Sequence, residues 1–446
     1  MRTKAFGIRK SSEGVRRVGF FEVDLPELAH DEVLIRVRSA GLNFNSIWSI
    51  DGKPADPFQL VTGMVRNNPG RESHLTAYQI IGSDASAVVV SVGQNVSNWV
   101  VGDEVVVHCS VVNLNDPLTN RDDLLSQSQA IWGYETNFGA FASYAIVREH
   151  QLHRKPSHLS WEDAASYMLT LSTAYRMLLS SNGARLTQGE TCLVWGASGG
   201  LGMFAIQLAK IVGARTVAVV SSDDRAEACL EIGADYVINR TEMKHSLIDE
   251  AGRPNPMAWR EWKKKISSLS IDEPDVVFEH VGRETLAASV YLARRGGRIV
   301  TCAASSGYES VIDLRYLWMQ VKSVIGSHIS NRQEAAEANQ LVMENKIVPV
   351  VSHQADFGEL PSLVDHLRSG RVTSNSQNPW TAADTDARCS VCGQPLRTGP
   401  HVSVVVPMFK SEDHIPGVIR YVSTISSTIP GGVRATFVID GSPENE

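Results

Sequence analysis

The segment "TCLVWGASGGLGMFAIQLAKIVGA", residues 191–214, decides the fold. An apolar run, 191–195, leads into Gly196-x-x-Gly199-x-x-Gly202, and a stretch with helical spacing follows. Glycines allow a tight turn and a close approach to a pyrophosphate, while the helix N-terminus offers free N–H groups and a positive dipole end. The alternative is a glycine-rich turn that serves packing alone. The strand before and the helix after favour a nucleotide site at Gly196, Ser198, Gly199, Gly200, Leu201 and Gly202.

The next strand ends "TVAVVSSDDRAEACLEIGADYVI", residues 216–238. An NAD site usually places an acid at this strand end, where it accepts from the ribose 2′-hydroxyl. Here Ser221 and Ser222 hold that position and Arg225 follows one turn later, a combination that suits a 2′-phosphate. The pattern therefore favours NADPH. Asp223 and Asp224 argue for NAD unless they start the next helix, and Arg225 has the alternative of an ordinary exposed helix cation.

The rest of the chain divides into a β-rich part and a part in which strands and helices alternate. Residues 1–150 read as mostly β, with alternating strands in 31–44 and 87–109, whereas strands and helices alternate from about 160 to 325. A helix is expected from Ser160, the predicted N-cap, to about residue 179. The expected boundaries are 1–160 for the first part of a catalytic domain, 161–325 for the cofactor domain, 326–372 for a return to the catalytic domain, 373–400 for a linker and 401–446 for a tail.

Composition excludes several function classes. The chain has 446 residues, 43% of them hydrophobic, and 42 basic against 49 acidic residues, a net charge of −7. This balance argues against nucleic-acid binding. The sequence shows no signal-peptide pattern and no apolar run long enough to cross a membrane. Four of the six cysteines stand singly in apolar or strand-like surroundings, which favours reduced thiols and a cytoplasmic protein.

The order of the two patterns resembles the medium-chain dehydrogenase/reductase superfamily, whose fold is a β-rich GroES-like catalytic domain with a Rossmann doubly wound parallel sheet. The segments "GLNFNSIW", "IGSDASAVVVSVG" and "VGDEVVV" match its first domain. Zinc members carry Gly-His-Glu and a four-cysteine lobe. This chain has Gly-Ser-Asp at 82–84 and lacks that lobe, so the resemblance implies no metal and reduction of a conjugated C=C bond.

Longer motifs resemble the crotonyl-CoA carboxylase/reductase family over about residues 15–372. They are "AIWGYETNFGA" (130–140), "VVFEHVGRETLAASV" (276–290), "SSGY" (305–308), "RYLWMQVKSVIGSH" (315–328) and the insertion "NPMAWREWKKKI" (255–266). The resemblance implies reduction of an enoyl-CoA by NADPH, with hydride added at Cβ and CO₂ captured by the Cα enolate to give an alkylmalonyl-CoA. It also implies a homodimer or homotetramer.

The resemblance further implies site residues. The motifs place the CO₂ pocket at Asn45, Tyr134, Glu135 and His328, further cofactor contacts at His280 and Tyr308, and a CoA phosphate contact at Arg315. CO₂ is apolar, so such a pocket must exclude water and offer a few fixed dipoles. Each position has a plainer alternative: a turn residue for Asn45, a cap on the N–H groups of 137–138 for Glu135, a core histidine for His328 and a surface ion pair for Arg315.

The chain departs from the family where Tyr134 replaces Phe, Val281 replaces Pro and Leu171 replaces Asn. The Tyr134 hydroxyl needs a partner when buried, and as a proton donor it would favour plain enoyl-CoA reduction. The segment "DGKPADPFQLVTGMVRNNPGRES" (51–73) replaces the family's usual loop, so acyl preference stays open. A non-catalytic NADPH-binding protein is the alternative from another class, because the family's last strand is missing after residue 372.

The tail carries two weaker signals. Residues 400–422 and 434–446 resemble the opening strand, helix and strand of family-2 glycosyltransferases, without the metal-binding acidic motif or the acceptor half. A piece that cannot complete its own sheet is expected to be poorly ordered or to dock elsewhere. Cys389-x-x-Cys392 supplies half of a zinc site, with His401 and His414 as the nearby candidates, so free thiols are the expectation.

Overall fold

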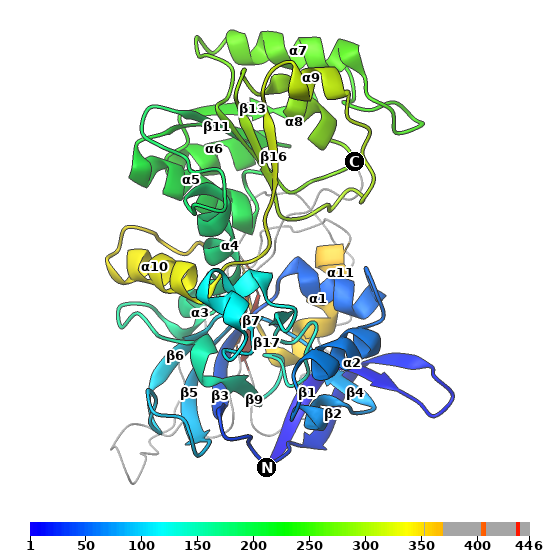
Figure 1. Cartoon of the computed structure of the whole chain (residues 1–446), viewed down its shortest axis with the longest axis vertical. Helices are drawn as coiled ribbons and strands as arrows, with labels where there is room; N and C mark the ends of the chain where they lie inside the picture. The colour runs from blue at the N-terminus through cyan, green and yellow to red at the C-terminus, as the bar shows by residue number, and fades with distance from the viewer. Residues whose placement is uncertain (352, 369–402, 407–433, 438–446) are drawn as a thin grey trace.

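The computed structural model describes residues 1–351, 353–368, 403–406 and 434–437. Figure 1 shows two domains stacked along the long axis, with the β-rich domain and the N-terminus at one end and the parallel sheet at the other. The chain crosses back from the parallel sheet to the β-rich domain between strand β16 and helix α10 (Figure 1). The expected two-domain α/β architecture is confirmed.

The second domain is a doubly wound parallel sheet. Among the described residues its strand order is β13-β12-β11-β14-β15-β16, which is the dinucleotide-binding order. The strands are β11 (Thr191–Val194), β12 (Arg215–Val220), β13 (Tyr236–Asn239), β14 (Val276–Glu279), β15 (Arg298–Thr301) and β16 (Ser323–Gly326). The helices are α5 (Gly200–Val212), α6 (Asp223–Glu231), α7 (Pro256–Ser267), α8 (Leu286–Leu292) and α9 (Leu314–Trp318).

Alternate residues of β11 face the two covering layers. Cys192 and Val194 join the apolar core beneath α4 and α5, whereas Leu193 and Trp195 join the core beneath α7. The insertion at 255–266 forms α7, and the ring of its Trp262 lies 4.9 Å from that of Trp195. The sheet is therefore buried on both faces, as its continuous apolar strands require.

The first domain consists of antiparallel strands with helices against them. One sheet has the order β2-β1-β4, and β3 pairs with β5 and β9 in a larger mixed sheet. The strands are β1 (Arg2–Lys10), β2 (Arg16–Asp24), β3 (Glu32–Gly41), β4 (Tyr78–Ile80), β5 (Ala85–Val92), β6 (Glu104–Val107), β7 (Ser110–Val111), β8 (Ala130–Ile131), β9 (Tyr144–Arg148), β10 (Leu152–Arg154) and β17 (His353–Asp356). The helices against these strands are α1 (Phe44–Asp51), α2 (Pro57–Asn67), α3 (Trp161–Ala164) and α11 (Leu360–Arg368). Helices α4 (Met168–Leu178) and α10 (Arg332–Met343) instead share the apolar core of β11 and α5.

Two local expectations need correction. The predicted helix from Ser160 is split, because α3 ends at Ala164 and α4 begins at Met168. Ser160 does cap α3, since its side chain accepts from the Asp163 N–H. Residues 57–67, expected as part of a loop, form α2, whose N-cap Asp56 accepts from the Phe58 N–H.

The two described tail segments are strands of the first domain's mixed sheet. Strand β18 (Ser403–Val406) pairs in parallel with β3 and antiparallel with β17, and β19 (Arg434–Phe437) pairs with the other side of β17. The tail strands therefore dock on the catalytic domain, one of the two outcomes expected. Cys389, Cys392, His401 and His414 lie outside the described residues.

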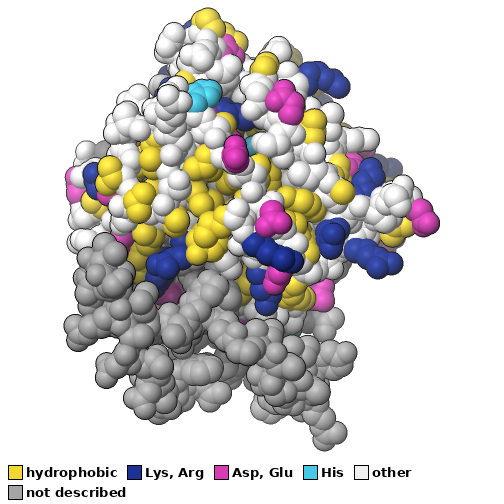
Figure 2. All heavy atoms as spheres, turned by 90° about the horizontal axis from the view of Figure 1, so that it is seen from below, with side chains coloured by type: hydrophobic (Ala, Val, Ile, Leu, Met, Phe, Trp, Pro, Cys, Tyr) yellow, Lys and Arg dark blue, Asp and Glu magenta, His cyan; other side chains and the backbone are white. Residues whose placement is uncertain are grey.

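The described surface carries mixed charge. Seen from below, basic and acidic side chains are interspersed with apolar ones (Figure 2), unlike the one-sign basic stripe of a nucleic-acid site. In the described part of the chain, no helix has both the length and the apolar character that crossing a membrane demands.

Candidate active site between the two domains

The glycine loop lies between β11 and α5, where the sequence predicts it. Gly199 is the N-cap of α5, and Gly200, Leu201 and Gly202 form its first turn. A Cβ added to Gly202 would lie 2.5 Å from the Gly196 carbonyl oxygen, so only glycine lets the helix approach the loop this closely. The helix start thus presents free N–H groups to a pyrophosphate. The residues present fit a dinucleotide.

The end of β12 holds the predicted 2′-phosphate group of residues together. Arg225 Nη1 donates to Ser221 Oγ at 2.6 Å, and Ser222 is the N-cap of α6. Asp223 and Asp224 occupy the first turn of α6, where acids complement the helix dipole. Asp223 also accepts from Asn239 Nδ2 at 2.9 Å. The guanidinium and the two hydroxyls thus lie at the strand end, while Asp223 and Asp224 act as helix starters.

Two further predicted cofactor residues come from the carboxyl side of the same sheet. His280 directly follows β14 and is buried, with Nε2 2.9 Å from the Trp195 carbonyl oxygen. Tyr308 lies in the segment between β15 and α9 and is exposed. Because parallel strands end at one edge, these residues and the glycine loop lie on the same side of the sheet.

The loop that carries Tyr134 and Glu135 follows β8 in the first domain. Glu135 Oε2 accepts from the Ile131 N–H at 2.8 Å. The carboxylate therefore does bind a backbone N–H of its own loop, but that N–H belongs to Ile131 and not to residues 137–138. Burial raises the pKa of Glu135. Tyr134 is buried, and its hydroxyl donates to the Lys53 carbonyl oxygen at 2.6 Å. Burial first, and then the charges of Glu135 and Tyr308, raise the pKa of Tyr134.

Apolar side chains from several elements surround this loop. Tyr134 packs in one cluster with Cys109, Ile131, Ile329, Trp48, Leu60, Leu124 and Leu169. These residues come from α1, α2, α4, β8, the link between β6 and β7, the turn at Asp123–Leu125 and the segment after β16. Cys109 also lies close enough to Asp84 and Glu135 for their charges, after burial, to raise its thiol pKa. The cluster makes a dry wall beside the Glu135 carboxylate.

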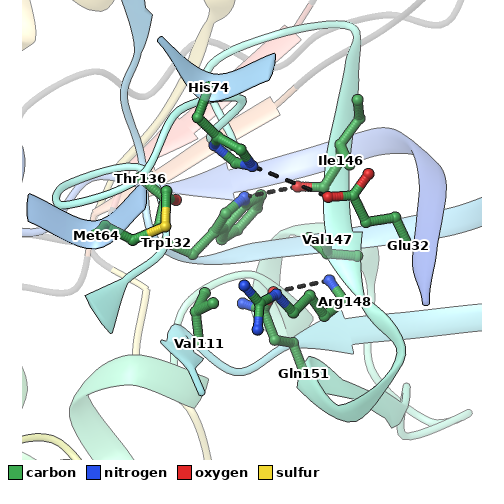
Figure 3. Close-up of a pocket in the computed structure, with 10 residues that line it drawn as sticks. All are labelled: Glu32, Met64, His74, Val111, Trp132, Thr136, Ile146, Val147, Arg148 and Gln151. Carbon is green, nitrogen blue, oxygen red and sulfur yellow. Dashed lines mark hydrogen bonds and ion pairs between the residues drawn. The ribbon is translucent and has the colours of Figure 1, made fainter. Parts of the chain in front are cut away.

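A buried polar group supports the loop from behind (Figure 3). His74 points toward Glu32, Trp132 Nε1 donates to the Ile146 carbonyl oxygen at 3.0 Å, and the Arg148 N–H donates to Gln151 Oε1 at 2.8 Å. Burial is the main cause that lowers the pKa of His74, and its Nδ1 accepts from the Asn137 N–H at 3.1 Å. The small cavity between these side chains therefore belongs to the support of the loop.

Asn45 lies in the first turn of α1, and its Nδ2 is 2.7 Å from Ser83 Oγ. Its Oδ1 is buried without a hydrogen-bond partner. A side-chain amide and a hydroxyl can exchange donor and acceptor roles by a flip of the amide. Either way, one polar end of the buried Asn45 amide has no hydrogen-bond partner in the protein. The alternative of a turn residue is wrong for Asn45, since it is helical.

The Gly-Ser-Asp segment at 82–84 places a buried carboxyl group between β4 and β5. Asp84 is fully buried, accepts from the Leu169 N–H at 3.3 Å, and burial raises its pKa well above the usual value. Its Oδ2 also accepts from Asn43 Nδ2 at 3.5 Å, and one carboxyl with an asparagine and a serine is a poor donor set for zinc. Within the ranges that the structure describes, no group of three or more His, Cys, Asp or Glu is placed to hold a metal.

His328 lies two residues beyond β16, at the edge where the glycine loop also lies. It is exposed, so the alternative of a core histidine is wrong. Surrounding protein atoms, and then the Arg176 charge, lower its pKa. The next residue, Ile329, belongs to the apolar cluster around Tyr134. The turn that carries His328 therefore contacts the Tyr134–Glu135 loop across the domain boundary.

Arg315 lies at the start of α9, away from these groups in the sequence and exposed. Its guanidinium pairs with the Asp313 carboxylate at 2.7 Å. The surface ion pair expected as an alternative is therefore present. An exposed pair of this kind is weak and leaves the guanidinium able to exchange Asp313 for a phosphate.

Sequence reasoning missed the residues that hold this site. Asn137 is buried, accepts at Oδ1 from the Ile80 and Phe138 N–H groups and donates to the Tyr78 carbonyl oxygen. The Asn-Phe-Gly turn was a usable signal for Asn137. Ser83 and His74 had none, because their partners are distant in the sequence.

Two family models match the chain. Residues 29–157 match the alcohol dehydrogenase GroES-like domain, and residues 200–344 match the zinc-binding dehydrogenase domain. The chain is 45% identical to a crotonyl-CoA reductase of Streptomyces collinus over 332 residues, which is 74% of this chain and 74% of that protein. It is 39% identical to a crotonyl-CoA carboxylase/reductase of Cereibacter sphaeroides over 348 residues, 76% of this chain and 78% of that protein.

Solved structures give the same relationship. The 2-octenoyl-CoA carboxylase reductase CinF in complex with NADP and 2-octenoyl-CoA superposes with a TM-score of 0.77 at 39% identity, over 83% of this chain and 85% of that one. The crotonyl-CoA carboxylase/reductase AntE in complex with NADP gives 0.72 at 33% identity, over 83% and 92%. Identity at this level over most of both chains shows that the protein belongs to the crotonyl-CoA carboxylase/reductase family of the medium-chain dehydrogenase/reductase superfamily.

Proposed function

We propose that the protein reduces an α,β-unsaturated acyl-CoA with NADPH and carboxylates the product at Cα, giving an alkylmalonyl-CoA. Family membership supports the reaction class. The observation that carries the proposal is the contact between two segments: Ile329, next to His328, packs with Tyr134, next to Glu135. The segments that carry the histidine and the carboxylate therefore share one apolar cluster, which supports placing the reaction there.

The chemistry demands this combination. Bound NADPH supplies hydride to Cβ of the enoyl thioester, which leaves an enolate with carbanion character at Cα. The pocket must keep water from this carbon, because a proton would end the reaction as a saturated acyl-CoA. The apolar cluster around Tyr134 serves that exclusion. Fixed dipoles must then hold CO₂ against the carbon.

We assign those dipoles to Asn45 and His328. The Asn45 amide has one polar end without a protein partner, and after the flip described above this end is an N–H donor for a CO₂ oxygen. The His328 ring has a lowered pKa, so it is neutral at pH 7 and keeps one N–H to donate. Glu135 uses Oε2 on the Ile131 N–H, and we propose that its other oxygen orders a water or a polar neighbour.

The test is product analysis with crotonyl-CoA, NADPH and labelled bicarbonate. Labelled ethylmalonyl-CoA formed in step with NADPH oxidation supports the proposal. Unlabelled butyryl-CoA as the sole product would reject carboxylation and leave plain reduction. A panel of longer enoyl-CoA thioesters, each with and without CO₂, would then define the acyl preference.

We propose that cofactor and CoA are held by separate groups. Ser221, Ser222 and Arg225 would bind the 2′-phosphate of NADPH, and the glycine loop would bind its pyrophosphate. His280 and Tyr308 would border the cofactor. Arg315 would release Asp313 and pair with a CoA phosphate. Weaker binding of CoA to an Arg315→Gln variant than to the wild type would support this.

We propose that the protein is a homodimer or a larger homo-oligomer in the cytoplasm. Strand β16 is the last of its sheet in the described structure, and it lies beside an exposed apolar patch. The patch comprises Val311, Leu314, Trp318, Met319, Val321 and Val324. Exposed apolar groups at a sheet edge suit a second copy. Sedimentation of the wild type and of Trp318→Glu tests this, with a shift toward monomer expected for the variant.

A further inference from the structure

A buried hydrogen bond joins the segment that carries His328 to the strand region after β6. Ser330 Oγ is 2.9 Å from His108 Nε2, and both residues are fully buried. Ser330 belongs to the segment between β16 and α10, two residues after His328. His108 follows β6 in the first domain, next to Cys109. The bond therefore links the His328 segment directly to the wall of the proposed CO₂ pocket.

The backbone between His328 and Ser330 needs such a constraint. Ile329 has φ of 31°, in the left-handed region that a β-branched residue rarely adopts. Conformations of this kind persist only where surrounding contacts over-determine them. Ile329 supplies one such contact by packing with Tyr134, and the Ser330–His108 bond supplies the other. Together they set the direction in which the His328 side chain leaves the strand.

His108 is held on its own side of the bond. Its N–H donates to the Gln151 carbonyl oxygen at 2.7 Å, and its carbonyl oxygen accepts from Gln151 Nε2 at 3.0 Å. The neighbouring Cys109 carbonyl oxygen accepts from the Trp132 N–H at 2.8 Å, just before Tyr134 and Glu135. The same short segment thus anchors both the Glu135 loop and the His328 turn.

We infer that His108 and Ser330 are positioning residues, whose hydrogen bond fixes the His328 ring relative to Asn45 and Glu135 and so favours CO₂ capture over protonation of the enolate. The inference rests on the proposed function. Both side chains are fully buried and bond to each other, and neither belongs to the groups assigned to the cofactor or to hydride transfer. Loss of the bond should therefore act on the partition of the enolate more than on NADPH oxidation.

The test compares two serines that flank His328. Ser330→Ala removes the hydroxyl that bonds His108, whereas Ser327→Ala removes a buried hydroxyl without a hydrogen-bond partner. For each variant and the wild type, the ratio of carboxylated to saturated product is measured against dissolved CO₂, with NADPH binding and thermal unfolding as checks of folding. A hydrogen bond of ordinary strength predicts a ratio roughly three- to tenfold lower in Ser330→Ala at limiting CO₂.

Saturating CO₂ should restore the product ratio in Ser330→Ala, because a less ordered site binds CO₂ more weakly but still carboxylates the enolate. Ser327→Ala should show the wild-type ratio at every CO₂ concentration. A wild-type ratio and CO₂ dependence in Ser330→Ala would overturn the inference while leaving the proposed function in place. Absence of labelled product from the wild type would overturn both. Should Ser330→Ala fail to bind NADPH, His108→Gln takes its place in the same comparison and is read by the same criteria.

Discussion

The Tyr134 hydroxyl donates its proton to the carbonyl oxygen of Lys53, at 2.6 Å. This contact bears on the one family position at which a plain ring is replaced by a phenol. The hydroxyl proton is committed to a backbone acceptor, and burial raises the pKa of Tyr134 still further from neutrality. A phenol in that state is a poor acid for an enolate. The geometry therefore argues against Tyr134 as the proton donor of a plain enoyl-CoA reductase.

Tyr134→Phe should leave the ratio of carboxylated to saturated product unchanged and should lower stability. The substitution leaves the Lys53 carbonyl oxygen without its donor, which costs about 1 kcal/mol. Product analysis with labelled bicarbonate and thermal unfolding measure the two effects. Tyr175→Phe is the control, since it removes a hydroxyl that bonds Glu337 between α4 and α10. A rise in carboxylation in Tyr134→Phe alone would restore the proton-donor hypothesis.

Gly202→Ala should abolish NADPH binding. The added methyl would meet the Gly196 carbonyl oxygen and Ala197 Cα, both at 2.5 Å, so the loop or the helix must move. Fluorescence titration with NADPH measures the loss. Gly63→Ala in α2 is the matched control, because no atom lies within 4 Å of its added methyl. Alanine in that helix interior should be neutral or stabilise by roughly 0.5–1 kcal/mol. Equal NADPH affinity of both variants would contradict the assignment of the loop.

Arg225→Gln should raise the KM for NADPH and change the KM for NADH little. Arg225 lies against Ser221 at the end of β12, where a 2′-phosphate would be bound. A hydrogen bond to a charged group is worth about 1.5–3 kcal/mol, which corresponds to roughly tenfold or more. Arg260→Gln, an exposed cation on α7, is the control. If the NADPH preference survived in Arg225→Gln, another group would have to select the cofactor.

The sequence predicted the parts of the fold that local pattern determines. The glycine loop is correct because strand, turn and helix are adjacent in the chain, and Ser160 is correct because capping is local. The break at 165–167 differs from the predicted continuous helix, and no Gly or Pro marks it in the sequence. Residues 57–67 form a helix where the family resemblance predicts a loop, and the Asp-Pro start at 56–57 is a local signal for that helix.

The site was predicted only as far as motifs reach. Motifs gave the positions of Asn45, Glu135 and His328, but not the contacts that hold them. Ser83 lies 38 residues from Asn45, and His108 lies 222 residues from Ser330. A hydrogen bond between positions so far apart follows from tertiary packing, which local patterns in one sequence do not reveal. The assignments of individual site residues stay predictions.

Carboxylation should not titrate with the ordinary histidine pKa. The pKa of His328 lies below its usual value of 6.5, so the folded ring gains its proton at a lower pH than a free histidine does. At fixed dissolved CO₂, the product ratio should therefore be constant from about pH 7.5 to about pH 6.5. The free energy of unfolding should fall over the same pH range as the pH is lowered. The unfolded chain has the higher His328 pKa, so it binds the proton first and is favoured by acid. A fall in the ratio centred on 6.5, absent in His328→Asn, would contradict a neutral ring.

The tail should stabilise the catalytic domain. Strand β18 lies between β3 and β17 in the mixed sheet, with Val404 opposite Ala40 on one side and opposite Ala355 on the other. Ending the chain after residue 400 would remove both ladders, and each backbone hydrogen bond contributes roughly 0.5–1.5 kcal/mol. It would also separate β3 from β17, whose chain continues into Phe357 and Leu360 of the core.

The chain that ends after residue 400 should therefore unfold at a temperature several degrees lower than the full chain. Its carboxylation activity should be lost over the same temperature range in which it unfolds. A chain ended after residue 438 keeps β18 and β19 and serves as the control. Differential scanning calorimetry with NADPH turnover on the same samples measures both quantities. Equal unfolding temperatures and equal turnover for the two truncated chains would show that the tail strands add nothing to the reductase. A stable, NADPH-binding full chain without turnover on any enoyl-CoA would instead favour the non-catalytic alternative.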